Sequence, residues 1–238
     1  MKLPFGKPAA QAKAETLDGL HRLRTLFPLE QRVTQAGPAA REAYRELLGH
    51  WRLGKNPDPA LAANPAVAAL AAVDAVVPDA QGIGCYPFSP VATGIRAHYR
   101  GASAHAMCAV DALAIARVSD ARTRIESVCA MCHAPVAVTV EADGSLDHDR
   151  VEAARVIWAQ NRGQRRIFSS PDGGNMAASE NSSLTPVLSC SLSLCRAILF
   201  VCPRCEPSEG QLYTLPQATA IGNAFFAFQR RLLDERGA

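Results

Sequence analysis

The sequence lacks the features of several common protein classes. No apolar stretch reaches the roughly 18 residues needed to cross a bilayer, and the N-terminal segment MKLPFGKPAAQAKAE has no continuous apolar core of the kind found in signal peptides. The formal net charge of +3 is too small to indicate nucleic-acid binding. We therefore expect a cytoplasmic protein with neither a nucleic-acid nor a membrane partner.

Several motifs of nucleotide-binding and hydrolytic enzymes are also missing. The chain has no glycine-rich phosphate loop, no GxSxG sequence and no HExxH sequence. Aromatic residues make up only 6% of the chain, so aliphatic residues and alanine must fill most of the core. With 238 residues the chain is long enough for one large domain or two small ones.

Cysteine, in contrast, occurs eight times. In the cytoplasm these thiols stay reduced, which favours metal binding or catalysis over structural disulfides.

The first hundred residues have the outline of a winged-helix unit. After a loose leader over residues 1–14, apolar periodicity predicts helices over about residues 15–27, 39–51 and 65–76. Two short extended segments follow, near residues 82–88 and 95–99. Three helices followed by a hairpin predict a winged-helix-like domain over residues 15–100, although no helix carries the basic face that DNA binding requires.

Residues 101–238 alternate between helix and strand patterns. A helix bearing Cys108 and Asp111 is predicted to run to about residue 117, and strands are predicted around residues 136–140 and 196–201. Residues 160–185 read as a long loop. A capping box at Thr214 and Gln217 begins the last helix, whose predicted buried stripe is Ile221, Phe225, Phe228 and Leu232. The fold class is therefore α+β: a winged-helix-like helical segment, then a mixed or antiparallel sheet with flanking helices.

Cys108 and Asp111 carry the most specific chemical signal. A thiol and a carboxyl group at positions i and i+3 of a helix lie on one face and can meet the same ligand. The helix N-terminus would stabilise the thiolate, which binds soft metals, while the acid can deliver a proton. On spacing alone, a core cysteine beside an N-terminal helix carboxylate is an equally good interpretation.

Two CxxC pairs add a second candidate site. Cys129 and Cys132 form CAMC, and Cys202 and Cys205 form CPRC. Two such pairs are typical of a structural zinc site when they are close in space. The alternative is two independent thiol pairs, buried or redox-active.

Residues 83–140 resemble the organomercurial (alkylmercury) lyase family. The matching pieces are IGCYPFSPVATGIRAHYRG, AHAMCAVDALAIA and ESVCAMCHAPVAVTV. The resemblance implies that Cys108 and Asp111 are catalytic, and the later match LCRAILFV places the second catalytic cysteine at Cys195. It further implies that Cys108 and Cys195 bind mercury, that no organic cofactor is needed, and that a thiol or a mercuric reductase accepts the Hg(II). The extra CxxC pairs are not typical of the family, nor is the sequence Leu199–Val201 after Cys195.

The function implied by the resemblance is protonolysis of a carbon–mercury bond in a small organometallic substrate. Three other interpretations stay open at this point. The chain could be a non-catalytic mercury-, copper- or zinc-binding protein on the same fold, a diverged lyase-like enzyme with another substrate, or a winged-helix regulator. Asp111 argues against a pure binder, because a binder has no use for a proton donor beside the thiol.

Overall fold

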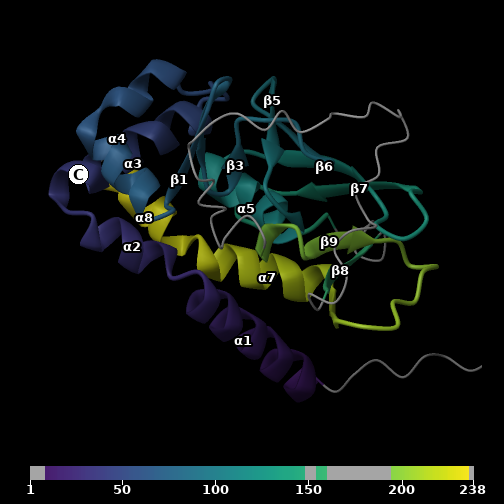
Figure 1. Cartoon of the computed structure of the whole chain (residues 1–238). Helices are drawn as coiled ribbons and strands as arrows, with labels where there is room; N and C mark the ends of the chain where they lie inside the picture. Colours follow the sequence, from purple (N-terminus) through teal and green to yellow (C-terminus); the bar gives the residue numbers. More distant parts are fainter. Residues whose placement is uncertain (1–8, 148–153, 160–193, 236–238) are drawn as a thin grey trace, which may run out of the picture.

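The computed structural model describes residues 9–147, 154–159 and 194–235 (Figure 1). Within these residues the chain forms a seven-stranded sheet, a three-stranded sheet and packed helices, which confirms the predicted α+β class. Every strand pairing in this part of the chain is antiparallel. None of the described helices is long and apolar enough to cross a membrane.

The N-terminal third is helical, as the periodicity predicted. The helices are α1 (Ala9–Leu26), α2 (Leu29–Gln35), α3 (Pro38–Arg52), η1 (Pro59–Ala63) and α4 (Pro65–Ala72). Helix α1 begins within the predicted loose leader, and Leu17, one of the apolar residues on which the first predicted helix rested, is 56% exposed. Helix α2 was not predicted, because its seven residues are too short to show a period. The third predicted helix ends early, since Asp74 adopts a left-handed backbone with φ of 56°.

The larger sheet has the strand order β1-β2-β3-β5-β4-β6-β7. Its strands are β1 (Val76–Asp79), β2 (Gly82–Cys85), β3 (Phe88–Ser89), β4 (Ile95–Tyr99), β5 (Ala102–Ala106), β6 (Thr123–Val128) and β7 (Pro135–Val140). Strand β5 was not predicted, because its alanine-rich sequence has little strand propensity. It pairs with β4 through a two-residue turn in which Arg100 and Gly101 both have positive φ, of 51° and 74°.

The predicted division of the chain at residue 100 falls within this turn. Strands on either side of the boundary belong to one sheet. Whether residues 15–100 form a unit of their own stays a prediction, and such a unit would share its sheet with the remainder of the chain.

The smaller sheet has the strand order β10-β8-β9. Its last strand in the sequence leads directly into the two C-terminal helices. Its strands are β8 (Arg155–Trp158), β9 (Ile198–Val201) and β10 (Gln211–Thr214). Helix α7 (Leu215–Phe225) begins with the predicted capping box, in which Thr214 accepts from Gln217. The predicted apolar stripe is buried, but the helix breaks at Phe226 and continues as α8 (Ala227–Asp234).

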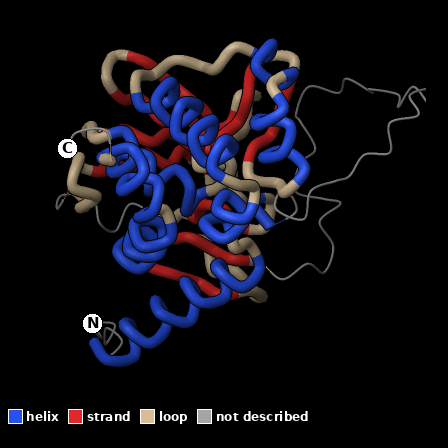
Figure 2. Tube along the Cα trace, turned by 90° about the vertical axis from the view of Figure 1, so that its left-hand side faces the viewer, coloured by secondary structure: helices blue, strands red, loops and turns tan. Residues whose placement is uncertain are grey.

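Helix α5 (Ala109–Ser119) is the central element of the fold. All of its residues except Arg117 are buried, between the strands of the larger sheet, β9 and the closing helices. The small residue Gly222 on α7 allows close packing, because a Cβ atom there would lie 2.8 Å from the carbonyl oxygen of Val110. Helix α1 runs alongside α7 (Figure 1), and Figure 2 shows helices packed against the strands. Whatever lies at the start of α5 is therefore enclosed by protein.

Candidate active site

Cys108 and Asp111 lie together at the start of α5. Cys108 is the N-cap residue, with an extended backbone, and its Sγ accepts a hydrogen bond of 3.4 Å from the backbone N–H of Asp111. The sequence predicted a thiol in the first turn of the helix, whereas the structure places it one residue before that turn. The thiol thereby caps the helix, and the carboxyl group projects from the first turn beside it.

Cys195 joins these two residues from a distant part of the chain. It precedes β9, and its Sγ lies 3.6 Å from Oδ2 of Asp111, to which it donates. The two sulfur atoms and the carboxylate oxygen all lie within 4.8 Å of one another. A single soft metal ion could therefore contact both sulfurs while the carboxyl group stays within reach of a group bound to that ion.

All three side chains of this trio are buried. Cys108, Asp111 and Cys195 are 3%, 4% and 8% exposed. Burial raises the pKa of Asp111 to about 7, and burial raises the pKa of Cys108 well above its ordinary value. The hydrogen bond with Cys108 lowers the pKa of Cys195, but burial and the nearby Asp111 raise it, and the net shift is upward. The two thiols of the free site therefore keep their protons near neutral pH, and Asp111 can both accept and donate one.

Burial therefore opposes the thiolate that was expected at Cys108. The helix N-terminus favours the anion, yet removal of the thiol from water outweighs that effect. A metal that binds this thiol must displace its proton.

The four cysteines of the CxxC pairs form a second cluster. Cys129 and Cys132 lie between β6 and β7, and Cys202 and Cys205 lie between β9 and β10. Their four sulfur atoms are within 4.8 Å of one another. The structure therefore brings the two pairs together, although about 70 positions separate them in the chain.

The remaining cysteines and histidines lie outside both clusters in the described part of the chain. Cys85 is fully buried in the larger sheet, in keeping with a structural role. The Nδ1 atom of His105 accepts from the backbone N–H of Thr93 at 3.2 Å. His133 is exposed, while Cys190 and the predicted loop over residues 160–185 fall outside the described residues.

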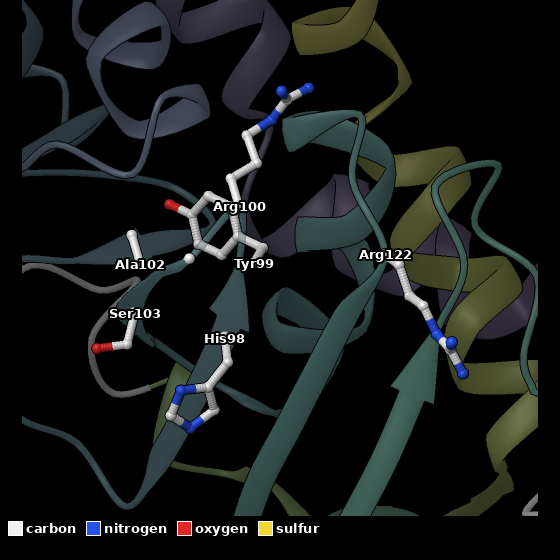
Figure 3. Close-up of a pocket in the computed structure, with 7 residues that line it drawn as sticks. His98, Tyr99, Arg100, Ala102, Ser103 and Arg122 are labelled. Carbon is white, nitrogen blue, oxygen red and sulfur yellow. The ribbon is translucent and has the colours of Figure 1, made fainter.

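A shallow depression of about 470 Å³ lies at the β4–β5 turn, away from both clusters (Figure 3). Its arginines are already engaged: Arg100 donates to the backbone carbonyls of Ser119 and Asp120, and Arg122 pairs with Glu141. The depression contains none of the trio and offers no comparable chemistry.

Comparison with known proteins gives a family match over part of the chain. Residues 88–168 match the family described as "MerB: Alkylmercury lyase". This match supports the alkylmercury lyase family for that part of the chain. The matched segment contains Cys108 and Asp111, whereas Cys195 lies beyond it. The match supports a carbon–mercury lyase-like enzyme, which the sequence resemblance implied.

A solved structure shares the fold. The "Crystal structure of the mercury-bound form of MerB2" matches with a TM-score of 0.56 and 20% identity, and the alignment covers 87% of this chain and 98% of that one. No curated protein matches the chain.

Two supporting residues escaped the sequence analysis. Gly222 permits the close approach of α7 to α5, and Arg155 holds the CPRC loop through its backbone carbonyls. A glycine inside a helical pattern was a visible signal for the first. The sequence contains no signal for the second, because the carbonyls that Arg155 contacts lie 48 and 50 positions away in the chain.

Proposed function

We propose that the chain cleaves carbon–mercury bonds by protonolysis and releases a hydrocarbon and Hg(II). The proposal rests on the trio at the start of α5, in which two thiols and one carboxyl group are buried within 4.8 Å of one another. Mercury is a soft ion that binds thiolates far better than water or carboxylates. Two thiols bind such an ion, and the third group is an acid.

Capture begins by thiol exchange. The organomercurial arrives bound to an external thiol. The sulfur of Cys108 or Cys195 forms a new bond to mercury, and the bond between mercury and the external thiol breaks. The proton of the protein thiol leaves with the departing external thiol. The organic group stays on mercury, and the other cysteine and Asp111 lie beside it.

Cleavage uses the proton of the second cysteine. As its sulfur binds mercury, its proton passes to Asp111, which Cys195 already faces at 3.6 Å. Asp111 then protonates the carbon, and the electron pair of the carbon–mercury bond becomes the new carbon–hydrogen bond. The products are the hydrocarbon and Hg(II) held by two thiolates, so the two thiol protons account for both protons transferred.

Burial of Asp111 suits this role. With its pKa raised to about 7, Asp111 can take up the thiol proton near neutral pH and then give it to the carbon, whereas an exposed aspartate is too weak a base to take it up. Exclusion of water also keeps the proton for the carbon. Two thiols of an acceptor, whether a small thiol or a mercuric reductase in the cytoplasm, would then remove Hg(II) by exchange.

The proposal is tested by incubating the purified protein with phenylmercuric or methylmercuric salt and excess thiol. Headspace gas chromatography then measures benzene or methane. Catalytic release of the hydrocarbon supports the proposal. Stoichiometric binding of the intact organomercurial without release would instead favour a non-catalytic soft-metal binding protein.

The matched control is Cys85→Ala. Cys85 is as deeply buried as the site cysteines but lies outside both clusters. This variant should keep its activity, and Cys108→Ala should lose it. Equal loss in both variants would point to a general effect of removing a buried thiol and would contradict the proposal.

A further inference from the structure

The second cysteine cluster consists of two tight turns that face each other. In the first turn, the backbone N–H of His133 donates to the carbonyl of Cys129 at 2.9 Å, and His133 has a left-handed φ of 58°. In the second turn, the N–H of Cys205 donates to the carbonyl of Cys202 at 3.2 Å. Each turn presents both of its sulfurs to the same point.

The distances between sulfurs are those of a metal site and not of disulfides. Sγ of Cys202 lies 3.6 Å from Sγ of Cys132 and 3.5 Å from Sγ of Cys205. A tetrahedral zinc with Zn–S bonds of about 2.3 Å separates its sulfurs by about 3.8 Å. A disulfide would require about 2.05 Å.

Backbone groups also favour sulfur anions at this cluster. Sγ of Cys129 accepts from the N–H of Met131 at 3.4 Å and from the N–H of Cys202 at 3.3 Å. Such hydrogen bonds stabilise a thiolate and fix its orientation around a metal. The second of them links the two turns directly.

The protein holds both turns in place by contacts outside the cluster. The N–H of Ala130 donates to the carbonyl of Phe200 on β9 at 2.9 Å. Arg155 on β8 donates to the carbonyls of Pro203 and Cys205 in the second turn. The four sulfurs are therefore positioned by the surrounding fold.

We propose that Cys129, Cys132, Cys202 and Cys205 bind one Zn(II) ion in a closed tetrathiolate site. Four sulfur ligands complete a tetrahedral zinc and leave no open position, so the ion has a structural role. It joins the β6–β7 turn of the larger sheet to the β9–β10 loop of the smaller one. Strand β9 lies between this site and Cys195, and the zinc therefore anchors the strand that follows the second active-site thiol.

Metal analysis of the protein purified without added zinc tests this site. We expect about one zinc per chain, and reduced metal-free protein should take up one Co(II) with the absorption bands of a tetrahedral tetrathiolate. Less than about a tenth of an equivalent of zinc, together with no uptake of either metal by the reduced protein, would overturn the proposal. The cobalt titration uses the native sequence, so it does not depend on the folding of any variant.

Three variants assign the ligands. Cys205→Ser should lower the zinc content at least several-fold or change the cobalt spectrum. His133→Asn should retain one equivalent, because asparagine tolerates the left-handed backbone and the histidine is not a ligand. Cys108→Ser should also retain it, since that thiol belongs to the other cluster. Loss of zinc in Cys108→Ser but not in Cys205→Ser would place the metal at the active site and contradict the assignment.

Discussion

Asp111 lies between two buried thiols, and its environment sets its protonation. Cys108 approaches it from its own helix and Cys195 from a segment 84 positions later in the chain. The carboxyl group is only 4% exposed, which disfavours its charged form. The same burial that raises its pKa makes it useful as an acid near neutral pH.

Replacing Asp111 with asparagine should separate binding from cleavage. The amide keeps the shape of the side chain but cannot transfer a proton, so hydrocarbon release should fall by at least about 100-fold. Mercury binding through the thiols should remain. The measurements are single-turnover hydrocarbon release and mercury retained after gel filtration. Release at the native rate would show that a thiol proton reaches the carbon without Asp111.

The same variant should change how stability depends on pH. The pKa of Asp111 is about 7 in the folded protein against an ordinary 3.8, so the unfolded chain loses the proton first as pH rises. The native protein should therefore lose stability between about pH 4 and pH 7, whereas Asp111→Asn should not undergo this loss. The melting temperature of the variant, relative to that of the native protein, should rise by more than about 3 °C between pH 4 and pH 7. A constant difference between the two proteins would contradict the raised pKa.

Cys195 was assigned from the family resemblance and now has geometric support. Cys195→Ala should reduce turnover by at least about 100-fold, since one thiol alone cannot drive cleavage. The folded state should be little affected, which circular dichroism would check against Cys85→Ala. Full methane or benzene release by Cys195→Ala would refute its role.

At the scale of elements, α5 determines the geometry of the site. Its sequence is rich in alanine, which allows the sheet on one side and α7 on the other to approach closely. The position of Val110 against Gly222 fixes the register of the two helices, one residue before Asp111.

Gly222→Ala should therefore disturb both stability and activity. The added Cβ would meet the carbonyl oxygen of Val110 at 2.8 Å, and backbone cannot move aside cheaply. We expect destabilisation of about 1–3 kcal/mol and lower turnover. Gly49→Ala is the matched control, because Gly49 lies within α3 with nothing within 4 Å of an added Cβ, and alanine there should stabilise the protein. Chemical denaturation and turnover compare the two. Equal stabilisation by both substitutions would contradict the tight contact.

At the scale of the whole molecule, the sequence predicted local secondary structure better than it predicted which distant segments meet. Periodicity and the capping box identified the long helices and the start of α7, because those signals lie within a few adjacent residues. Strand β5 was missed because tertiary pairing overrides the low strand propensity of its alanines. The two CxxC pairs predicted a metal site from the sequence. Their four sulfurs come together through the pairing of β8 with β9 and the contact of that sheet with the β6–β7 turn.

The candidate active site likewise has one part that the residues predicted and one part that they did not. Cys108 and Asp111 were predicted to lie together, because one helix start carries both. The residues themselves gave no reason to add Cys195, and its place depended on the resemblance until the fold placed its sulfur 3.6 Å from Asp111.

The central claim is that two thiols and Asp111 deliver a proton to carbon bound to mercury. The direct measurement is the isotopic composition of the hydrocarbon released from an organomercurial by protein equilibrated in D₂O. We predict hydrocarbon carrying a single deuterium from the native protein and none released above background by Asp111→Asn. Hydrocarbon without deuterium, or mercury retained with its organic group intact by the native protein, would contradict the account.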